Sequence, residues 1–273
     1  MFTEVVGGVL TAVELYEKRA TISAFFKRAA RFLLNGTSLV GVFGAGGTGK
    51  TTLGNFLSGE LDTDKTIKGY EETIRIGNFK VKGETPALLS VVPGQEARRP
   101  NSWKELYAEL SSGKSFRVIN VVSWGHHASE LEHTAHKVYS ENQSNEEFSN
   151  LYIKDSLAEE LSALETLVPH LIATPGKIRM ITLVTKQDLW WNQRHEVDKY
   201  YRSGPYSEII AKIFKSKGEA NFSHEYVSCA LVEQNLKMAD QFTIALTAQG
   251  YDDSLRVANL ERAYSTITQM IEK

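Results

Sequence analysis

Hydrophobic positions along the chain change their period several times, and each change predicts a new element. Residues 3–35 carry apolar side chains at helical spacing and end at Asn35-Gly36, which predicts a helical N-terminal extension over residues 1–36. Residues 38–43 form a near-continuous apolar run, which is typical of a strand buried on both faces. Similar runs predict further strands at residues 73–81, 86–92, 116–124, 178–184 and 225–228.

Helical spacing recurs between these strands. It predicts helices at residues 50–57, 151–172, 206–217 and 252–271. Strands that alternate with helices imply an α/β fold of three layers, in which a mostly parallel central sheet is covered on both faces. We therefore expect one domain over residues 37–273. Within it, the polar residues 126–150 predict an insertion or a mobile loop.

Composition and charge place the chain among ordinary globular proteins, with 42% hydrophobic residues, 23% charged residues and a formal net charge of −2. This balance gives the whole chain no attraction to nucleic acid, so no nucleic-acid partner is expected. The single cysteine, Cys229, excludes an intramolecular disulfide and fits a reducing compartment. Neither a secretory signal nor a stretch apolar enough to span a bilayer is found. We expect a cytoplasmic protein.

A glycine-rich segment follows the first buried strand. Residues 44–51, GAGGTGKT, match the phosphate-loop pattern G-x-x-x-x-G-K-[ST]. Glycines let the backbone curl so that its N–H groups converge on phosphates, and the helix that follows adds its positive dipole end. Lys50 would reach the β- and γ-phosphates, and Thr51 would offer its hydroxyl to a magnesium ion, Mg²⁺. The predicted phosphate-binding residues are Gly44, Ala45, Gly46, Gly47, Thr48, Gly49, Lys50, Thr51 and Thr52.

The end of the strand at 178–184 carries Thr185-Lys186-Gln187-Asp188, which resembles the [NT]-K-x-D guanine motif of the P-loop GTPase superfamily. The resemblance implies that the Asp188 carboxylate accepts hydrogen bonds from the N1–H group and the exocyclic amine of guanine, whereas adenine has no matching donor pair. Lys186 would lie along the base and the ribose. Another resemblance, to the S-A-[KL] base-binding loop, adds Ser228, Cys229 and Ala230 to the predicted base site.

The VPGQ sequence at residues 92–95 resembles the D-x-x-G-Q region of Ras-like small GTPases. The resemblance implies that Gln95 orients the attacking water and that the Gly94 N–H group contacts the γ-phosphate, with Lys50 as the other catalytic residue. Val91 occupies the aspartate position of that region, so the usual carboxylate near Mg²⁺ is absent. In this respect the chain is similar to the bacterial polarity GTPases of gliding motility, which have the same VPGQ form.

The remaining catalytic and metal candidates lie in loops. The resemblance implies a threonine that contacts Mg²⁺ in the loop at residues 60–70, and Thr66 is preferred to Thr63 and Thr73. Arg98 and Arg99 follow Gln95 and could supply positive charge in the transition state. The favoured interpretation is that both arginines lie on a solvated helix face.

Two other patterns invite an interpretation that we do not favour. His126, His127, His133 and His136 form a histidine-rich stretch, but no cysteine lies nearby and a zinc site is not expected. The helix at residues 20–34 has a basic face opposite its phenylalanines and could contact an anionic membrane peripherally. Packing of the phenylalanine face on the nucleotide-binding domain is favoured instead.

Together these motifs predict a P-loop protein that binds GTP and GDP with Mg²⁺, hydrolyses GTP slowly and acts as a switch on a protein partner, either an effector or an activating protein. One alternative is a GTP-binding scaffold with little or no turnover, because the aspartate position holds Val91. The other is a P-loop ATPase or phosphotransferase in which the resemblance at residues 185–188 is coincidental.

Overall fold

The structure of the protein is a computed structural model, and it describes residues 38–60, 77–81, 87–94, 99–110, 115–128, 144–238 and 242–272. The predicted helical extension over residues 1–36, with its amphipathic helix at 20–34, lies outside the described residues. Several candidate side chains do so as well, namely Thr63, Thr66, Thr73, Gln95, Arg98, His133 and His136. Their roles stay predictions.

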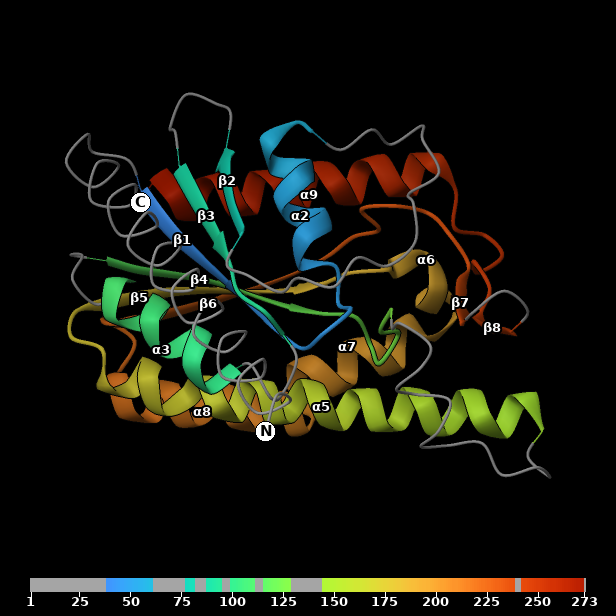
Figure 1. Cartoon of the computed structure of the whole chain (residues 1–273), viewed down its shortest axis with the longest axis horizontal. Coiled ribbons are helices and arrows are strands. Elements are labelled where there is room, and N and C mark those ends of the chain that lie inside the picture. The colour runs from blue at the N-terminus through green and yellow to red at the C-terminus, as the bar shows by residue number, and fades with distance from the viewer. Residues whose placement is uncertain are drawn as a thin grey trace, which may run out of the picture.

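Six strands form one central sheet in the order β2-β3-β1-β4-β5-β6 (Figure 1). Every neighbouring pair is parallel except β2 and β3, which are antiparallel. The strands are β1 (Ser38–Phe43), β2 (Gly77–Val81), β3 (Ala87–Val91), β4 (Ser115–Val122), β5 (Lys177–Val184) and β6 (Phe222–Ser228). The predicted α/β class with a mostly parallel sheet is confirmed.

Helices cover both faces of the sheet and complete the three layers (Figure 1). On one face lie α2 (Lys50–Ser58) and α9 (Asp253–Glu272). The other face carries α3 (Arg99–Leu110), α5 (Asn145–Ala173), α7 (Arg194–Ser203) and α8 (Pro205–Lys217). The remaining elements are the short helices α6 (Gln187–Trp190) and η2 (Trp191–Gln193) and the hairpin of β7 (Leu236–Met238) and β8 (Phe242–Ala245).

The two larger clusters of buried side chains lie on opposite sides of the sheet. Alternate residues of β1 enter different clusters, because successive side chains of a strand point to opposite faces. Val40 and Val42 pack with α2 and α9. Phe43 packs on the other side, where its ring stacks on Tyr107 of α3 at a centroid distance of 5.2 Å. Burial on both faces explains why β1 is an uninterrupted apolar run.

Some elements differ from the sequence-based prediction. α5 begins at Asn145 rather than Leu151, because Ser144 and Glu147 form a capping box that starts the helix within the stretch predicted as an insertion. The helix α7 was not predicted, since only Val197 and Tyr201 of this polar segment are buried. A helix face at Arg98 and Arg99 was expected, but the bounds of α3 were not predicted, although Trp103, Leu106, Tyr107 and Leu110 are buried at helical spacing.

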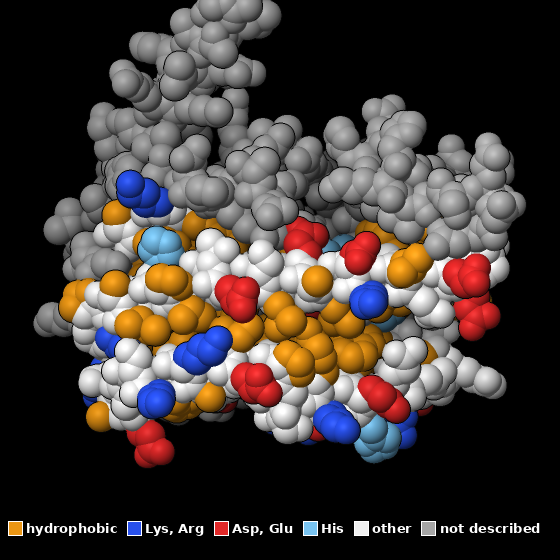
Figure 2. Space-filling view, turned by 90° about the horizontal axis from the view of Figure 1, so that it is seen from below, with side chains coloured by type: hydrophobic (Ala, Val, Ile, Leu, Met, Phe, Trp, Pro, Cys, Tyr) orange, Lys and Arg blue, Asp and Glu red, His pale blue; other side chains and the backbone are white. Residues whose placement is uncertain are grey.

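The outer face of the α5 and α8 layer mixes apolar and charged side chains (Figure 2). Two large apolar side chains of α5 are exposed by more than a third, Leu151 at 38% and Ile172 at 36%. Across the described part of the chain, no helix combines the length and the apolar character needed to cross a membrane.

Candidate functional site

The phosphate loop connects the end of β1 to the start of α2, as the motif requires. Three of its glycines have positive φ angles: 132° at Gly44, 70° at Gly47 and 97° at Gly49. A side chain at Gly47 would also collide with the backbone, because its Cβ would lie 1.9 Å from the carbonyl oxygen of Ala128. Both the backbone conformation and the close approach therefore require glycine at this position.

Lys50 begins α2 and is buried, with 5% of its surface exposed. Its ammonium group donates a hydrogen bond of 2.6 Å to the carbonyl oxygen of Ala45. A Cβ added to Gly94 would lie 2.3 Å from the Lys50 Nζ atom, so the segment after β3 lies directly against the tip of this side chain. The adjacent Pro93 is fixed by the indole of Trp103, which donates to its carbonyl oxygen at 3.0 Å. The structure thus brings Gly94 and Lys50 together.

The threonines of the phosphate loop have different environments. Thr48 is fully buried, and its hydroxyl donates to the carbonyl oxygen of Ala45 at 3.1 Å. Thr51 and Thr52 lie in the first turn of α2 and are half-buried. Thr48 is therefore a structural member of the loop, whereas Thr51 and Thr52 retain accessible surface.

Residues 185–188 follow β5 at the same edge of the sheet, and two of them contact the phosphate loop. The Thr185 hydroxyl donates to the carbonyl oxygen of Thr48 at 2.6 Å. The Lys186 ammonium donates to the carbonyl oxygen of Gly47 at 2.9 Å and also to that of His126. Burial lowers the pKa of Lys186 to about 7, against the opposing effect of Asp188. The two sequence motifs therefore form one connected structure.

The Asp188 carboxylate lies in the interior, with 1% of the residue exposed. Its Oδ2 atom accepts a hydrogen bond of 3.1 Å from the backbone amide of Gln234. Its Oδ1 atom has no hydrogen-bond partner among the described residues. Burial raises the pKa of Asp188 to about 6, although the Gln234 hydrogen bond opposes the shift. A buried acceptor oxygen without a hydrogen-bond partner favours a ligand that brings a hydrogen-bond donor.

Residues 228–230 begin at Ser228, the last residue of β6, and lie beside Gln187. The Gln187 side-chain amide donates to the Ser228 hydroxyl at 3.1 Å, and its other end accepts from the Tyr251 hydroxyl at 3.2 Å. The Cys229 side chain is fully buried in the core, and burial raises the pKa of its thiol to about 12. Any contact of this segment with a ligand would therefore use the backbone or Ser228, not the Cys229 thiol.

The metal and catalytic candidates are only partly described. Val91, at the position where Ras-like proteins have aspartate, is a fully buried residue of β3 that pairs with Val42. Arg99 is the first residue of α3. Thr66, Gln95 and Arg98 lie outside the described residues. In the ranges that the structure describes, no group of three or more His, Cys, Asp or Glu side chains is arranged to hold a metal ion.

Sequence reasoning missed residues 123–128, the loop that follows β4, which we name the β4 loop. It was assigned in part to the insertion, yet the Ala128 amide donates to the Gly47 carbonyl oxygen at 3.0 Å. The signal was available, because β4 was predicted as a buried strand and parallel strands of such a sheet end at the same edge. Glu160, whose carboxylate holds this loop, gave no signal, since an acidic residue within a helix is usually solvated.

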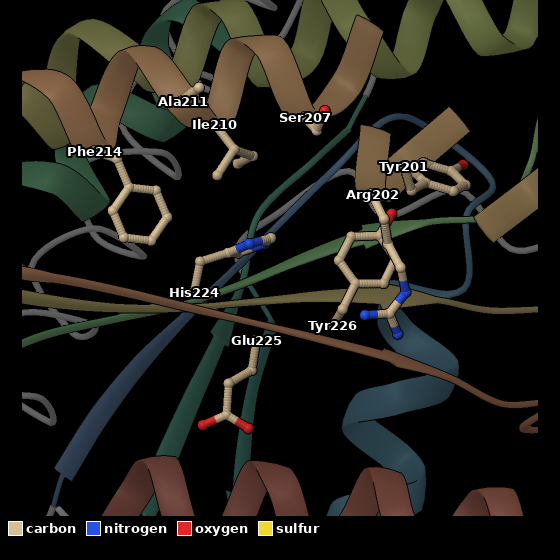
Figure 3. Close-up of a pocket in the computed structure, with 9 residues that line it drawn as sticks. All are labelled: Tyr201, Arg202, Ser207, Ile210, Ala211, Phe214, His224, Glu225 and Tyr226. Carbon is tan, nitrogen blue, oxygen red and sulfur yellow. The ribbon is translucent and has the colours of Figure 1, made fainter. Parts of the chain in front are cut away.

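A cavity of about 480 Å³ lies elsewhere, where β6 faces α7 and α8 (Figure 3). His224, Tyr226 and Phe214 line it, and the guanidinium of Arg202 lies 4.8 Å from the centre of the Tyr226 ring. The cavity shares no lining residue with the phosphate loop or with residues 185–188. It is therefore separate from the candidate site.

Comparisons with known proteins identify similar solved structures only. No family model and no curated protein sequence matches the chain. A chain of the mammalian SRP receptor aligns with a TM-score of 0.40 and 16% identity, over 71% of this chain and 91% of that one. The Arl6 (BBS3) small GTPase from Trypanosoma brucei, with the bound nucleotide analogue GppNp, aligns with a TM-score of 0.35 and 13% identity, over 70% of this chain and 87% of that one.

Proposed function

We propose that this protein binds GTP and GDP, with the phosphates in the loop at residues 44–51 and the guanine edge at Asp188. The observation that carries the proposal is the buried Oδ1 atom of Asp188, which has no partner among the described residues. It lies two residues from Lys186, whose ammonium is bonded to the phosphate loop at Gly47. A base at Asp188 and a phosphate chain in the loop would thus be held by parts of one connected site.

The phosphate end of the site supplies positive potential. Backbone amides of the glycine-rich loop and the N-terminus of α2 point to the same region in phosphate loops of this kind. Lys50 begins that helix, and its ammonium is held at the Ala45 carbonyl oxygen beside Gly94. A polyphosphate that binds there would gain the charge of Lys50 together with the oriented amides.

Selectivity for guanine follows from the acceptor character of the Asp188 carboxylate. An ionised carboxylate only accepts hydrogen bonds, so it pairs with the N1–H and exocyclic amine of guanine but not with the acceptor nitrogen at the corresponding position of adenine. One of its oxygens is already bonded to the Gln234 amide. Binding of guanine would therefore involve Oδ1 first, and Oδ2 keeps a second lone pair for a further hydrogen bond.

Magnesium fits the donors near Lys50 only in part. Mg²⁺ prefers oxygen ligands and usually keeps several waters beside substrate phosphates and one or two protein groups. The half-buried Thr51 hydroxyl is a suitable oxygen donor, and Thr66 is the proposed second one. The buried Val91 offers no oxygen where Ras-like proteins have a carboxylate. When bound, the ion would offset negative charge on the phosphates, held on the protein side by Thr51 and Thr66.

Hydrolysis and switching form the second part of the proposal. Gln95 would orient the attacking water, and the Gly94 amide would respond to a terminal phosphate, a role supported by the close approach of Gly94 to the Lys50 ammonium. No arginine is assigned to the transition state, so the intrinsic rate would be slow and a protein partner would raise it or read the nucleotide state. Val91 specifically favours one alternative, a GTP-binding scaffold without turnover.

Nucleotide competition tests the binding proposal. The purified protein is titrated with fluorescent GTP and then with unlabelled GTP, ATP or xanthosine triphosphate as competitors. GTP should compete and ATP should not. Equal competition by ATP would instead support an ATPase or phosphotransferase. Single-turnover hydrolysis with bound GTP, with and without added Mg²⁺, then separates the slow GTPase from the scaffold.

A further inference from the structure

Glu160 is a buried charged residue beside the candidate site that has no role in the proposed function. It lies within α5 and is fully buried. Its Oε1 atom accepts hydrogen bonds from the amides of Ser123 at 2.8 Å and Gly125 at 3.2 Å, and it is 3.1 Å from the Nε2 atom of His127. Its Oε2 atom accepts from the Tyr201 hydroxyl. A buried carboxylate needs such partners, and here all of those named except Tyr201 come from the β4 loop, which adds the Ser123 hydroxyl at 3.5 Å.

The β4 loop has a conformation that needs this support. Trp124 and Gly125 both have positive φ angles, 53° and 70°, which is unusual for tryptophan. The Tyr201 hydroxyl that donates to Glu160 also accepts from the Trp124 amide at 3.0 Å. Tyr152 of α5 fixes the other end of the loop, because its hydroxyl donates to the His127 carbonyl oxygen at 2.8 Å. Glu160 and Tyr201 thus hold the tight turn in place.

The far side of the β4 loop contacts both parts of the candidate site. The His126 carbonyl oxygen accepts from the Lys186 ammonium. The Ala128 amide donates to the Gly47 carbonyl oxygen, which also accepts from Lys186. A shift of the loop would therefore move Lys186 and the phosphate loop together.

From these contacts we infer that Glu160 and Tyr201 are positioning residues for the nucleotide site: they fix the β4 loop so that His126 and Ala128 hold Lys186 and Gly47. The inference rests on the proposed function, because it deepens how that site is built. Neither residue is assigned to touch nucleotide. Tyr201 also lines the cavity shown in Figure 3, and its hydroxyl lies on the side of the ring away from Phe214 and His224.

A matched pair of tyrosines separates positioning from general stability. Tyr201→Phe removes the hydroxyl bonded to Glu160 and Trp124. Tyr206→Phe removes an equally buried hydroxyl that instead contacts Asn120 at 2.7 Å and Thr182 at 2.9 Å. Both variants should have lower melting temperatures. Only Tyr201→Phe should weaken binding of fluorescent GTP, by about tenfold, while Tyr206→Phe stays within about twofold of wild type.

A double-mutant cycle tests whether the effect passes through Lys186. In a Lys186→Ala background the β4 loop has no ammonium left to orient. The loss of GTP-binding free energy on Tyr201→Phe should then be less than about half of the loss in the wild-type background, where the affinity falls about tenfold. Full additivity of the two substitutions would overturn the route through Lys186.

Hydrogen exchange decides the inference without any nucleotide. The nucleotide-free variants are compared under conditions in which their free energies of unfolding are equal. The amides of residues 44–50 and 126–128 should then exchange faster in Tyr201→Phe and Glu160→Gln than in Tyr206→Phe. Equal exchange in all three variants would overturn the positioning role. If the wild-type protein binds no guanine nucleotide, the proposed function fails, but this comparison still shows whether Glu160 and Tyr201 hold the loop.

Discussion

The ammonium group of Lys186 donates a hydrogen bond of 2.9 Å to the carbonyl oxygen of Gly47. It joins the end of β5 to the phosphate loop, although the two residues are far apart in the sequence. Thr185 adds a second link, from its hydroxyl to the Thr48 carbonyl oxygen. These bonds fix the distance between the proposed phosphate and base subsites before any nucleotide binds, which lowers the cost of ordering the site.

Replacing Lys50 by alanine should abolish tight nucleotide binding. The substitution removes the full positive charge that begins α2 beside Ala45 and Gly94. A charge-assisted contact to phosphate contributes about 1.5–3 kcal/mol, so affinity should fall by at least about tenfold. Fluorescent GTP titration measures the loss, with Lys212→Ala on the exposed surface of α8 as the control. Affinity in Lys50→Ala within a few-fold of wild type would remove the phosphate-loop assignment.

Replacing Asp188 by asparagine should weaken GTP and favour xanthosine triphosphate. The change turns two acceptor oxygens into one acceptor and one donor, which matches the additional carbonyl of xanthine. The expected loss for GTP is about 1.5–3 kcal/mol. Competition titrations measure both nucleotides. Asp198→Asn is the control, since Asp198 forms an exposed ion pair with Arg202. Unchanged nucleotide preference in Asp188→Asn would mean that residues 185–188 do not bind a base.

Replacing Gly47 by alanine should damage both stability and nucleotide binding. The residue has a φ angle of 70°, and its new Cβ would meet the Ala128 carbonyl oxygen at 1.9 Å. Gly218 is the matched control, because its φ angle is 74° but no atom lies within 4 Å of its added Cβ. With a ψ angle of 158°, Gly218 has an extended backbone at positive φ that essentially only glycine adopts, so Gly218→Ala should cost about 1–3 kcal/mol for the backbone alone. Chemical unfolding of both variants gives the difference, and equal losses would contradict the predicted collision.

The sequence was sufficient for the fold class and for the strand, glycine-rich loop and helix at residues 38–58, because both depend on local patterns. The apolar run of β1 and the glycines after it predict the strand, the loop and α2 without any long-range information. The end of β4 could have been placed at the same sheet edge, but the specific contact of Ala128 with Gly47 could not be predicted, since it depends on the turn geometry at Trp124. Glu160 was equally hidden, because its burial depends on how α5 packs.

Acid should destabilise the folded protein in part through His224. Burial, with the nearby Arg202 charge, lowers the pKa of His224 to about 4 from an ordinary value of 6.5. The unfolded state therefore binds more protons between these values, so stability is lost as the pH falls from 6.5 to 4. His224→Gln should retain a polar contact with Thr182 and remove roughly 1–3 kcal/mol of that pH dependence.

Urea unfolding at several pH values measures this effect. The exposed His195 of α7 provides the control variant, His195→Gln. His126 contributes in the same direction in every variant, because burial lowers its pKa to about 4 as well. The buried Asp188 contributes in the opposite direction, since its raised pKa makes the folded state the better proton binder at low pH. An unchanged pH slope in His224→Gln would show that His224 is charged or solvated in the folded state.

Replacing Gln95 by leucine distinguishes a slow GTPase from a scaffold. Orientation of the attacking water matters only in the transition state, so hydrolysis should fall by about a hundredfold while GTP affinity stays within about twofold. Chromatography of bound GTP and GDP over time, with protein in excess, gives the single-turnover rate. Gln269→Leu on the outer surface of α9 is the control. If bound GTP stays intact over time in both wild type and Gln95→Leu, the protein is a scaffold that binds GTP without hydrolysing it, as expected from the buried Val91. If instead both hydrolyse GTP rapidly, another group positions the water.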